Sequence, residues 1–152
     1  MRTLREKSEI GKPWKQVEEM SAAASRGQRL LRIALLGNAG FSLLSGIIIY
    51  GWREKLFHAL GISERFNALL LSVPLAIFAL WLLINAVRSE INLLEARLAV
   101  AMDFVWVALS LPVLVFLPLN GLGTLVVAIV AAIVLCFAIS QWLGISRIRK
   151  NG

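Results

Sequence analysis

The chain has 152 residues, of which 59% are hydrophobic and 16% are charged, whereas a soluble domain is usually about 45–50% apolar. Its formal net charge is +7 at pH 7, but the basic residues flank long apolar segments, so we expect a membrane protein with no nucleic-acid partner. The single cysteine, Cys136, excludes an internal disulfide and a CxxC redox pair.

Residues 1–30 form a polar, basic arm that we expect on the cytoplasmic side. Pro13 suits the start of a helix, and Gly27 suits a break in it. Two alternatives stay open for this arm, an amphipathic helix on the inner leaflet and a partly disordered basic tether. In the first alternative, three apolar residues share the face toward the lipid: Trp14, Val17 and Met20.

Four apolar segments follow, and each has about 20 residues or more, which is what a helix needs to cross about 30 Å of hydrocarbon. They cover residues 33–52, 66–87, 98–117 and 122–145. The joints between them are short, which favours one compact antiparallel arrangement. We therefore predict an all-α fold, a membrane-embedded antiparallel four-helix bundle over residues 31–148.

Residues 53–65, between the first and second spans, form an amphipathic loop that we expect on the external side. Apolar residues recur there at helical spacing beside charged ones: Trp52, Leu56, Phe57 and Leu60. This pattern predicts a short interfacial helix. His58 is the only histidine of the chain, so we interpret it as a surface residue and not as a metal ligand.

Lysine and arginine are distributed unevenly about the predicted spans. Thirteen of them lie on the side of the two termini and the second joint, and three lie on the other side. Because cytoplasmic flanks carry the excess of positive charge, we expect both termini in the cytoplasm.

Each predicted span has one amide or carboxyl side chain in the third of the membrane nearest the termini: Asn38, Asn85, Asp103 and Gln141. Asp103 is the only charged residue inside any of the four segments. Since such groups avoid lipid, we expect these four to form a polar layer that faces the bundle interior. Neighbouring residues that could support the layer are Ser42, Ser45, Trp81, Trp106 and Ser110.

Three interpretations of this layer stay open. Its groups could hydrogen-bond between helices and fix their register, at about 0.5–2 kcal/mol for each bond. They could instead line a small polar cavity, with Asp103 as a proton or cation carrier. In the third interpretation, Asp103 reaches headgroup water and has little effect.

A faint internal repeat relates the first and third spans. Its matched positions are Asn38, Phe41 and Ser45 in the first span and Asp103, Trp106 and Ser110 in the third. Both spans then continue to a loop and return in a helix that ends in basic residues. A duplication of one helical hairpin would explain this pattern.

Three segments carry a resemblance to a known group of proteins: "GNAGFSLLSG" in the first span, "AMDFVWVALS" in the third and "ISQWLGI" in the fourth. Together they resemble a group of small bacterial integral membrane proteins with four helices, for which no activity is established. The resemblance implies the four-helix fold and a bacterial inner (plasma) membrane, and it implies no catalytic residue.

The functional expectation is a non-enzymatic accessory or scaffold component of the membrane. No nucleophile–base pair, metal-ligand cluster or phosphate-binding loop is visible, so we expect no catalytic residue and no metal or cofactor. The partners we expect are the lipid bilayer and either a second copy or another membrane protein. The alternative is a small proton-coupled carrier that uses Asp103. Small multidrug transporters are similar in size, but their essential carboxylate is a glutamate in the first span, where the nearest polar position here is Asn38.

Overall fold

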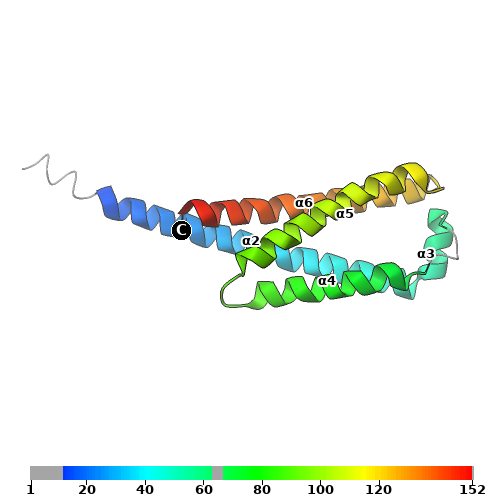
Figure 1. Ribbon diagram of the computed structural model, residues 1–152, viewed down its shortest axis with the longest axis horizontal. Helices are drawn as coiled ribbons and strands as arrows, with labels where there is room; N and C mark the ends of the chain where they lie inside the picture. The colour runs from blue at the N-terminus through cyan, green and yellow to red at the C-terminus, as the bar shows by residue number, and fades with distance from the viewer. Residues whose placement is uncertain (1–11, 63–66, 152) are drawn as a thin grey trace, which may run out of the picture.

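The computed structural model describes residues 12–62 and 67–151. This part of the chain contains no strand and consists of α2 (Lys12–Gly51), α3 (Arg53–Leu60), α4 (Leu69–Val87), α5 (Leu93–Phe116), α6 (Gly121–Asn151) and short connections. All of these helices except α3 are long and apolar enough to cross a membrane. The prediction of an all-α membrane protein with four spans is therefore confirmed, and the long helices pack as a bundle (Figure 1).

α2 is much longer than one membrane span requires. Its 40 residues extend over about 60 Å, which is about twice the thickness of the hydrocarbon layer. From Lys12 onward, the arm expected at residues 1–30 continues along the line of the first span (Figure 1). Residues 12–30 are therefore helical, and the position of the arm relative to the membrane stays a prediction. Residues 1–11 lie outside the described residues.

The interpretation of Gly27 as a helix break is wrong, because Gly27 lies inside α2. The missing side chain serves helix packing instead. A Cβ atom on Gly27 would lie 2.9 Å from the Cβ of Arg147 in α6, and one on Gly144 would lie 2.8 Å from the Cβ of Leu31. Both glycines therefore let α2 and α6 approach closely, as small residues do at interfaces between membrane helices.

α2 is the central helix of the bundle, since α4 and α6 both pack along it. α5 packs on α6 but contacts α4 little, and α4 and α5 diverge from the loop that joins them (Figure 1). We call the end of the bundle with this loop the loop end, and the opposite end the α3 end. A cluster of buried apolar residues lies toward the loop end: Leu31, Leu35, Ala39, Leu82, Ala86, Ile91, Ala96, Ala99, Val100 and Ile145.

The packing of the two helical hairpins can be compared with the suggested duplication. The α2–α4 and α5–α6 pairs each pack along their length, as two copies of one hairpin would. The contacts between the hairpins are unequal, because α2 and α6 meet extensively whereas α4 and α5 do not. The duplication stays a prediction.

α3 lies across the end of the bundle opposite the α4–α5 loop, in the segment where the sequence predicted a short helix (Figure 1). Its apolar side buries Phe57 and Leu60, which are 4% and 7% exposed. Asn120 fastens α3 to the start of α6: its Nδ2 donates to the carbonyl of Ala59 at 2.8 Å, and its Oδ1 accepts from the backbone N–H of Gly123 at 2.8 Å. The short helix is thus part of the packed structure.

Candidate functional site

Asp103 lies on α5 with only 2% of its surface exposed. Two amide groups from other helices donate to its carboxylate. The Nδ2 of Asn38 on α2 lies 2.7 Å from Oδ2 and 3.0 Å from Oδ1, and the Nε2 of Gln141 on α6 lies 2.9 Å from Oδ2. One side chain on α5 therefore bonds to two other spans. We call Asn38, Asp103 and Gln141 the polar triad.

Helical spacing places a further donor beside the triad. Ser42 follows Asn38 by one turn of α2, and its hydroxyl donates to the Oδ1 of Asn38 at 3.5 Å. Side chains four residues apart share one face of a helix, so these two point in the same direction. The hydroxyl thereby helps to orient the amide so that its nitrogen faces the carboxylate of Asp103.

Gln141 is completely buried, and its two amide atoms have different surroundings. The Nε2 atom donates to Asp103, whereas the Oε1 atom is buried and accepts no hydrogen bond from the described part of the chain. A buried carbonyl without a donor costs free energy. In the triad, the carboxylate therefore has hydrogen-bond donors, whereas one amide oxygen has none among the described residues.

Close packing surrounds the triad. The exposed fractions are 1% for Asn38, 4% for Ser42 and 0% for Gln141. Small residues lie about one turn away on the same helices, and Ala99 and Ala138 are both 0% exposed. Small side chains let helix backbones approach until short amides can reach across. The described atoms thus enclose the Asp103 carboxylate on the inside of the bundle.

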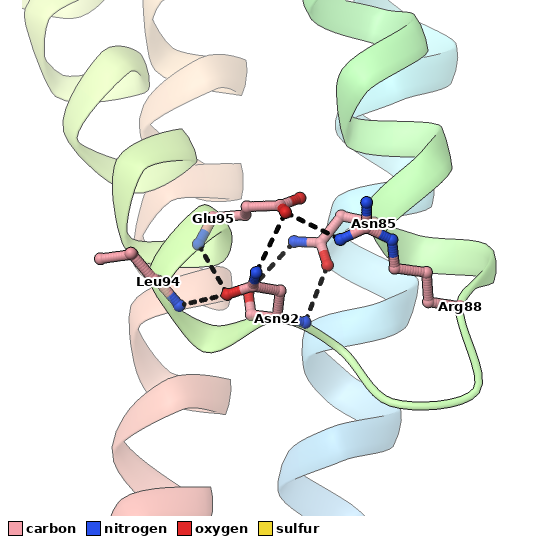
Figure 2. A network of polar contacts seen from close by, with 5 residues as sticks. All are labelled: Asn85, Arg88, Asn92, Leu94 and Glu95. Atoms are coloured by element: carbon pink, nitrogen blue, oxygen red, sulfur yellow. Dashed lines mark hydrogen bonds and ion pairs between the residues drawn. The ribbon is translucent and has the colours of Figure 1, made fainter.

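Asn85 does not join the triad, although the sequence suggested that it shared their layer. It lies close to the end of α4 and bonds the backbone of Asn92 across the α4–α5 loop (Figure 2). Its Oδ1 accepts from the N–H of Asn92 at 2.9 Å, and its Nδ2 donates to the carbonyl of Asn92 at 3.3 Å. Asn85 therefore holds the α4–α5 loop against the end of α4.

A second polar network at the loop end escaped the sequence analysis (Figure 2). The Oδ1 of Asn92 caps α5 by accepting from the N–H groups of Leu94 and Glu95 at 3.0 and 3.3 Å. The Oε1 of Glu95 accepts from Asn92 Nδ2 at 3.0 Å and pairs with Arg88 at 2.7 Å. The sequence contained a signal for this helix cap. Asn92 is followed three residues later by Glu95, which is a pattern typical of helix starts.

Arg32 extends this network to α2. Its Nη2 donates to the carbonyls of Arg88 and Ser89, at 2.8 and 3.1 Å. The last carbonyls of a helix have no partner within the helix, and a cation is favourable near them. Arg32 thus caps the end of α4 and ties the loop to the central helix.

The supporting residues that the sequence suggested are dispersed. Ser42 is beside the triad, whereas the hydroxyl of Ser110 donates to the carbonyl of Trp106 in its own helix at 2.9 Å. Trp81 is half-buried and its ring lies 6.0 Å from that of Phe78. Trp106 and Ser45 are also half-buried. The described hydrogen bonds to Asp103 come from amides and not from these indoles.

The triad consists of one carboxylate and two amides, which can hold helices together or bind a proton or a small cation. Across residues 12–62 and 67–151, no three His, Cys, Asp or Glu side chains are grouped as a possible metal site. Comparison of the chain with protein-family models, with curated proteins and with solved structures gave no match. The function is therefore inferred from the geometry of this chain's own residues.

Proposed function

We propose that this protein is a non-enzymatic accessory or scaffold component of a bacterial inner membrane, with both termini in the cytoplasm. Its membrane-spanning character follows from four long apolar helices. The orientation is supported by the excess of lysine and arginine at the loop end and the termini. In this proposal, the triad fixes the relative positions of α2, α5 and α6.

The observation that carries the proposal is that the buried carboxylate of Asp103 accepts hydrogen bonds from amides on two other helices. A carboxylate that transports a proton or cation needs a path to water, whereas Asp103 is 2% exposed. Interhelical hydrogen bonds in membranes contribute about 0.5–2 kcal/mol each. Buried polar groups of this kind can also specify a single register, because a shifted register leaves them without partners.

A proton-coupled carrier is the second candidate. The observation that favours it is the buried Oε1 of Gln141, which accepts no hydrogen bond from the residues that the structure describes. If Asp103 accepted a proton, rotation of the Gln141 amide would turn this oxygen toward the new O–H donor. Such a change would couple the charge of Asp103 to a neighbouring helix, which a carrier requires.

Proton flux and stability, measured on the same variants, distinguish the two candidates. Wild type, Asp103→Asn and Asp103→Leu are reconstituted into liposomes that contain a pH-sensitive dye, and a pH gradient is applied. The scaffold proposal predicts the same slow flux for wild type, for Asp103→Asn and for liposomes without protein. It also predicts that Asp103→Leu unfolds more readily, because both amide donors lose their acceptor.

A proton flux in wild type that disappears in a folded Asp103→Asn protein would refute the scaffold proposal and support the carrier. Loss of folding in Asp103→Asn, or flux unchanged by this substitution, would exclude a carrier based on Asp103. Unfolding monitored by tryptophan fluorescence in detergent shows which variants are folded. Asp103→Asn keeps the size of the side chain and one acceptor, so it is the matched control for Asp103→Leu.

A further inference from the structure

A cleft of about 440 Å³ opens at the α3 end, where the end of α2, the first turn of α3 and the start of α4 meet. Its walls include Tyr50, Arg53, Glu54, Phe57, Asn67 and Leu69. Phe57 is buried and forms an apolar wall, whereas Arg53 and Glu54 bring opposite charges to the opening. None of these residues belongs to the polar triad.

The two charges are held close together but weakly. The Nη2 of Arg53 lies 3.5 Å from the Oε1 of Glu54, and their side chains are 56% and 83% exposed. An exposed ion pair at this distance contributes little free energy, so either charge can exchange its partner at small cost. A ligand with a negative and a positive group side by side could therefore bind both at once.

The cleft lies at the level where lipid headgroups are expected. α2 and α4 are spans, and the cleft borders the last turn of α2 and the first residue of α4. Tyr50, Trp52 and Leu69, on or beside its rim, are 55%, 57% and 47% exposed. Exposed tyrosine and tryptophan at the ends of spans are typical of the membrane–water interface. A lipid beside these residues would bring its headgroup to Arg53 and Glu54.

We propose that this cleft binds the headgroup of a phospholipid that carries both a phosphate and a primary amine, namely a phosphoethanolamine lipid. The guanidinium of Arg53 binds the phosphate, for which arginine is well suited. The carboxylate of Glu54 accepts hydrogen bonds from the ammonium group. Asn67, whose Oδ1 accepts from the N–H of Leu69, adds its amide N–H groups as donors for the phosphate.

The charge pattern predicts selectivity among headgroups. A phosphocholine has the same two charges, but its quaternary ammonium has no N–H to donate to Glu54. A phosphoglycerol has the phosphate without a positive group, so it has no cation to pair with Glu54 and to offset the repulsion between that carboxylate and the phosphate. The expected order of affinity is therefore phosphoethanolamine first, then phosphocholine and phosphoglycerol.

Lipid titration followed by native mass spectrometry tests this proposal. The full chain is purified in a non-ionic detergent and titrated with short-chain phosphatidylethanolamine, phosphatidylcholine or phosphatidylglycerol of equal acyl length. We expect wild type to bind phosphatidylethanolamine about fivefold more tightly than the other two, which is the size expected for one charged hydrogen bond at a partly exposed site. Glu54→Gln should abolish this preference, and Arg53→Gln should weaken all three lipids.

Two control variants separate the cleft from general effects of charge. Glu90→Gln removes an exposed carboxylate at the loop end, and His58→Gln changes an exposed residue of α3 that does not line the cleft. Both should keep the preference of wild type. Equal affinity of wild type for the three lipids would overturn the proposal, as would an unchanged preference in Glu54→Gln.

Free phosphoethanolamine distinguishes a lipid site from a site for a soluble ligand. At millimolar concentration it should displace little of the bound lipid, because the acyl chains contribute much of the binding. Complete displacement, or tight binding of free phosphoethanolamine without lipid, would overturn the assignment to a lipid. Since Arg53 and Glu54 are exposed, we expect both variants to fold, and circular dichroism checks this.

Discussion

At the scale of single residues, Asp103 and Asn92 both stabilise the bundle by accepting hydrogen bonds, Asp103 between the helices and Asn92 at the loop end. Asp103 offers its oxygens to buried amide donors, and Asn92 offers one to N–H groups of the first turn of α5, which have no partner within the helix. Asp103 accepts from side-chain amides on α2 and α6, and Asn92 accepts from the backbone at the start of α5. The first group joins three helices, and the second begins one helix and fixes the loop before it.

Substitution of Asn92 by alanine tests the role of the cap. The variant loses the acceptor for Leu94 and Glu95 and the donor to Glu95. We expect the free energy of unfolding to fall by about 1 kcal/mol, which is typical for loss of a helix cap. Hydrogen exchange of the backbone amides in residues 88–96 should become faster.

Ser89→Ala is the matched control for Asn92→Ala, since Ser89 lies in the same loop and contributes its backbone carbonyl to Arg32. It should exchange at the rate of wild type. Exchange in Asn92→Ala as slow as in this control would show that the cap contributes nothing to the loop.

Part of this residue-scale picture was available from the sequence. The sequence placed Asn38, Asp103 and Gln141 in the same third of the membrane, and the structure brings these three side chains together. Depth alone could not predict the hydrogen-bond partners of Asn85. It lies only three residues before Arg88, so its side chain reaches the loop backbone before it can reach another span.

At the scale of helices, glycine decides how closely α2 and α6 pack. Gly27 and Gly144 face the partner helix, whereas a Cβ atom on Gly40 would meet nothing within 4 Å. The same residue type therefore has opposite consequences at different positions of the bundle. Where a helix backbone lies opposite, a methyl group must displace it, and displacement of packed backbone is costly.

Gly144→Ala and Gly40→Ala form a matched pair that tests this packing. The new Cβ at position 144 would lie 2.8 Å from the Cβ of Leu31 and 3.0 Å from its backbone atoms. We expect Gly144→Ala to lower the free energy of unfolding by about 1–3 kcal/mol. Gly40→Ala should be neutral or slightly stabilising, because alanine favours a helix more than glycine does.

Thermal unfolding in one detergent, monitored by circular dichroism, compares the two variants. Equal stability of Gly144→Ala and wild type would mean that α2 and α6 do not approach closely at this point. Destabilisation of Gly40→Ala would mean that a partner covers this face of α2.

The positions of the helices were predictable, but their full lengths were not. Apolar runs reveal where lipid surrounds a helix, and they located all four spans. They say nothing about whether a helix continues into water. α2 and α6 continue beyond the apolar runs because they pack on each other there. Nothing in the sequence indicated that Gly27 and Gly144 lie where these two helices meet.

At the scale of the whole molecule, the bundle is built around α2. α4 and α6 pack on it directly, whereas α5 packs mainly on α6 and reaches α2 through Asp103. The triad is therefore a direct link between α5 and the central helix. Sequence periodicity could not reveal this order of helices, because short loops are compatible with several arrangements.

The orientation of the molecule in the membrane leads to a separate prediction. In a Cys136→Ser background, single cysteines are placed at Ser25, in the N-terminal half of α2, and at His58 on α3; both positions are exposed. In intact cells, a maleimide that cannot cross the inner membrane should label position 58 and not position 25. Permeabilised cells should show labelling at both positions. The reverse pattern in intact cells would contradict cytoplasmic termini.

The most direct test of the structural role of the triad is a double-mutant cycle of Asp103→Leu and Gln141→Leu. The free energy of unfolding is measured for wild type, both single variants and the double variant under one set of conditions. We predict that each single substitution destabilises the bundle and that the double variant is more stable than the sum of the two effects implies. The coupling should be about 0.6–2 kcal/mol. Effects that add to within about 0.3 kcal/mol would contradict a structural bond between these side chains.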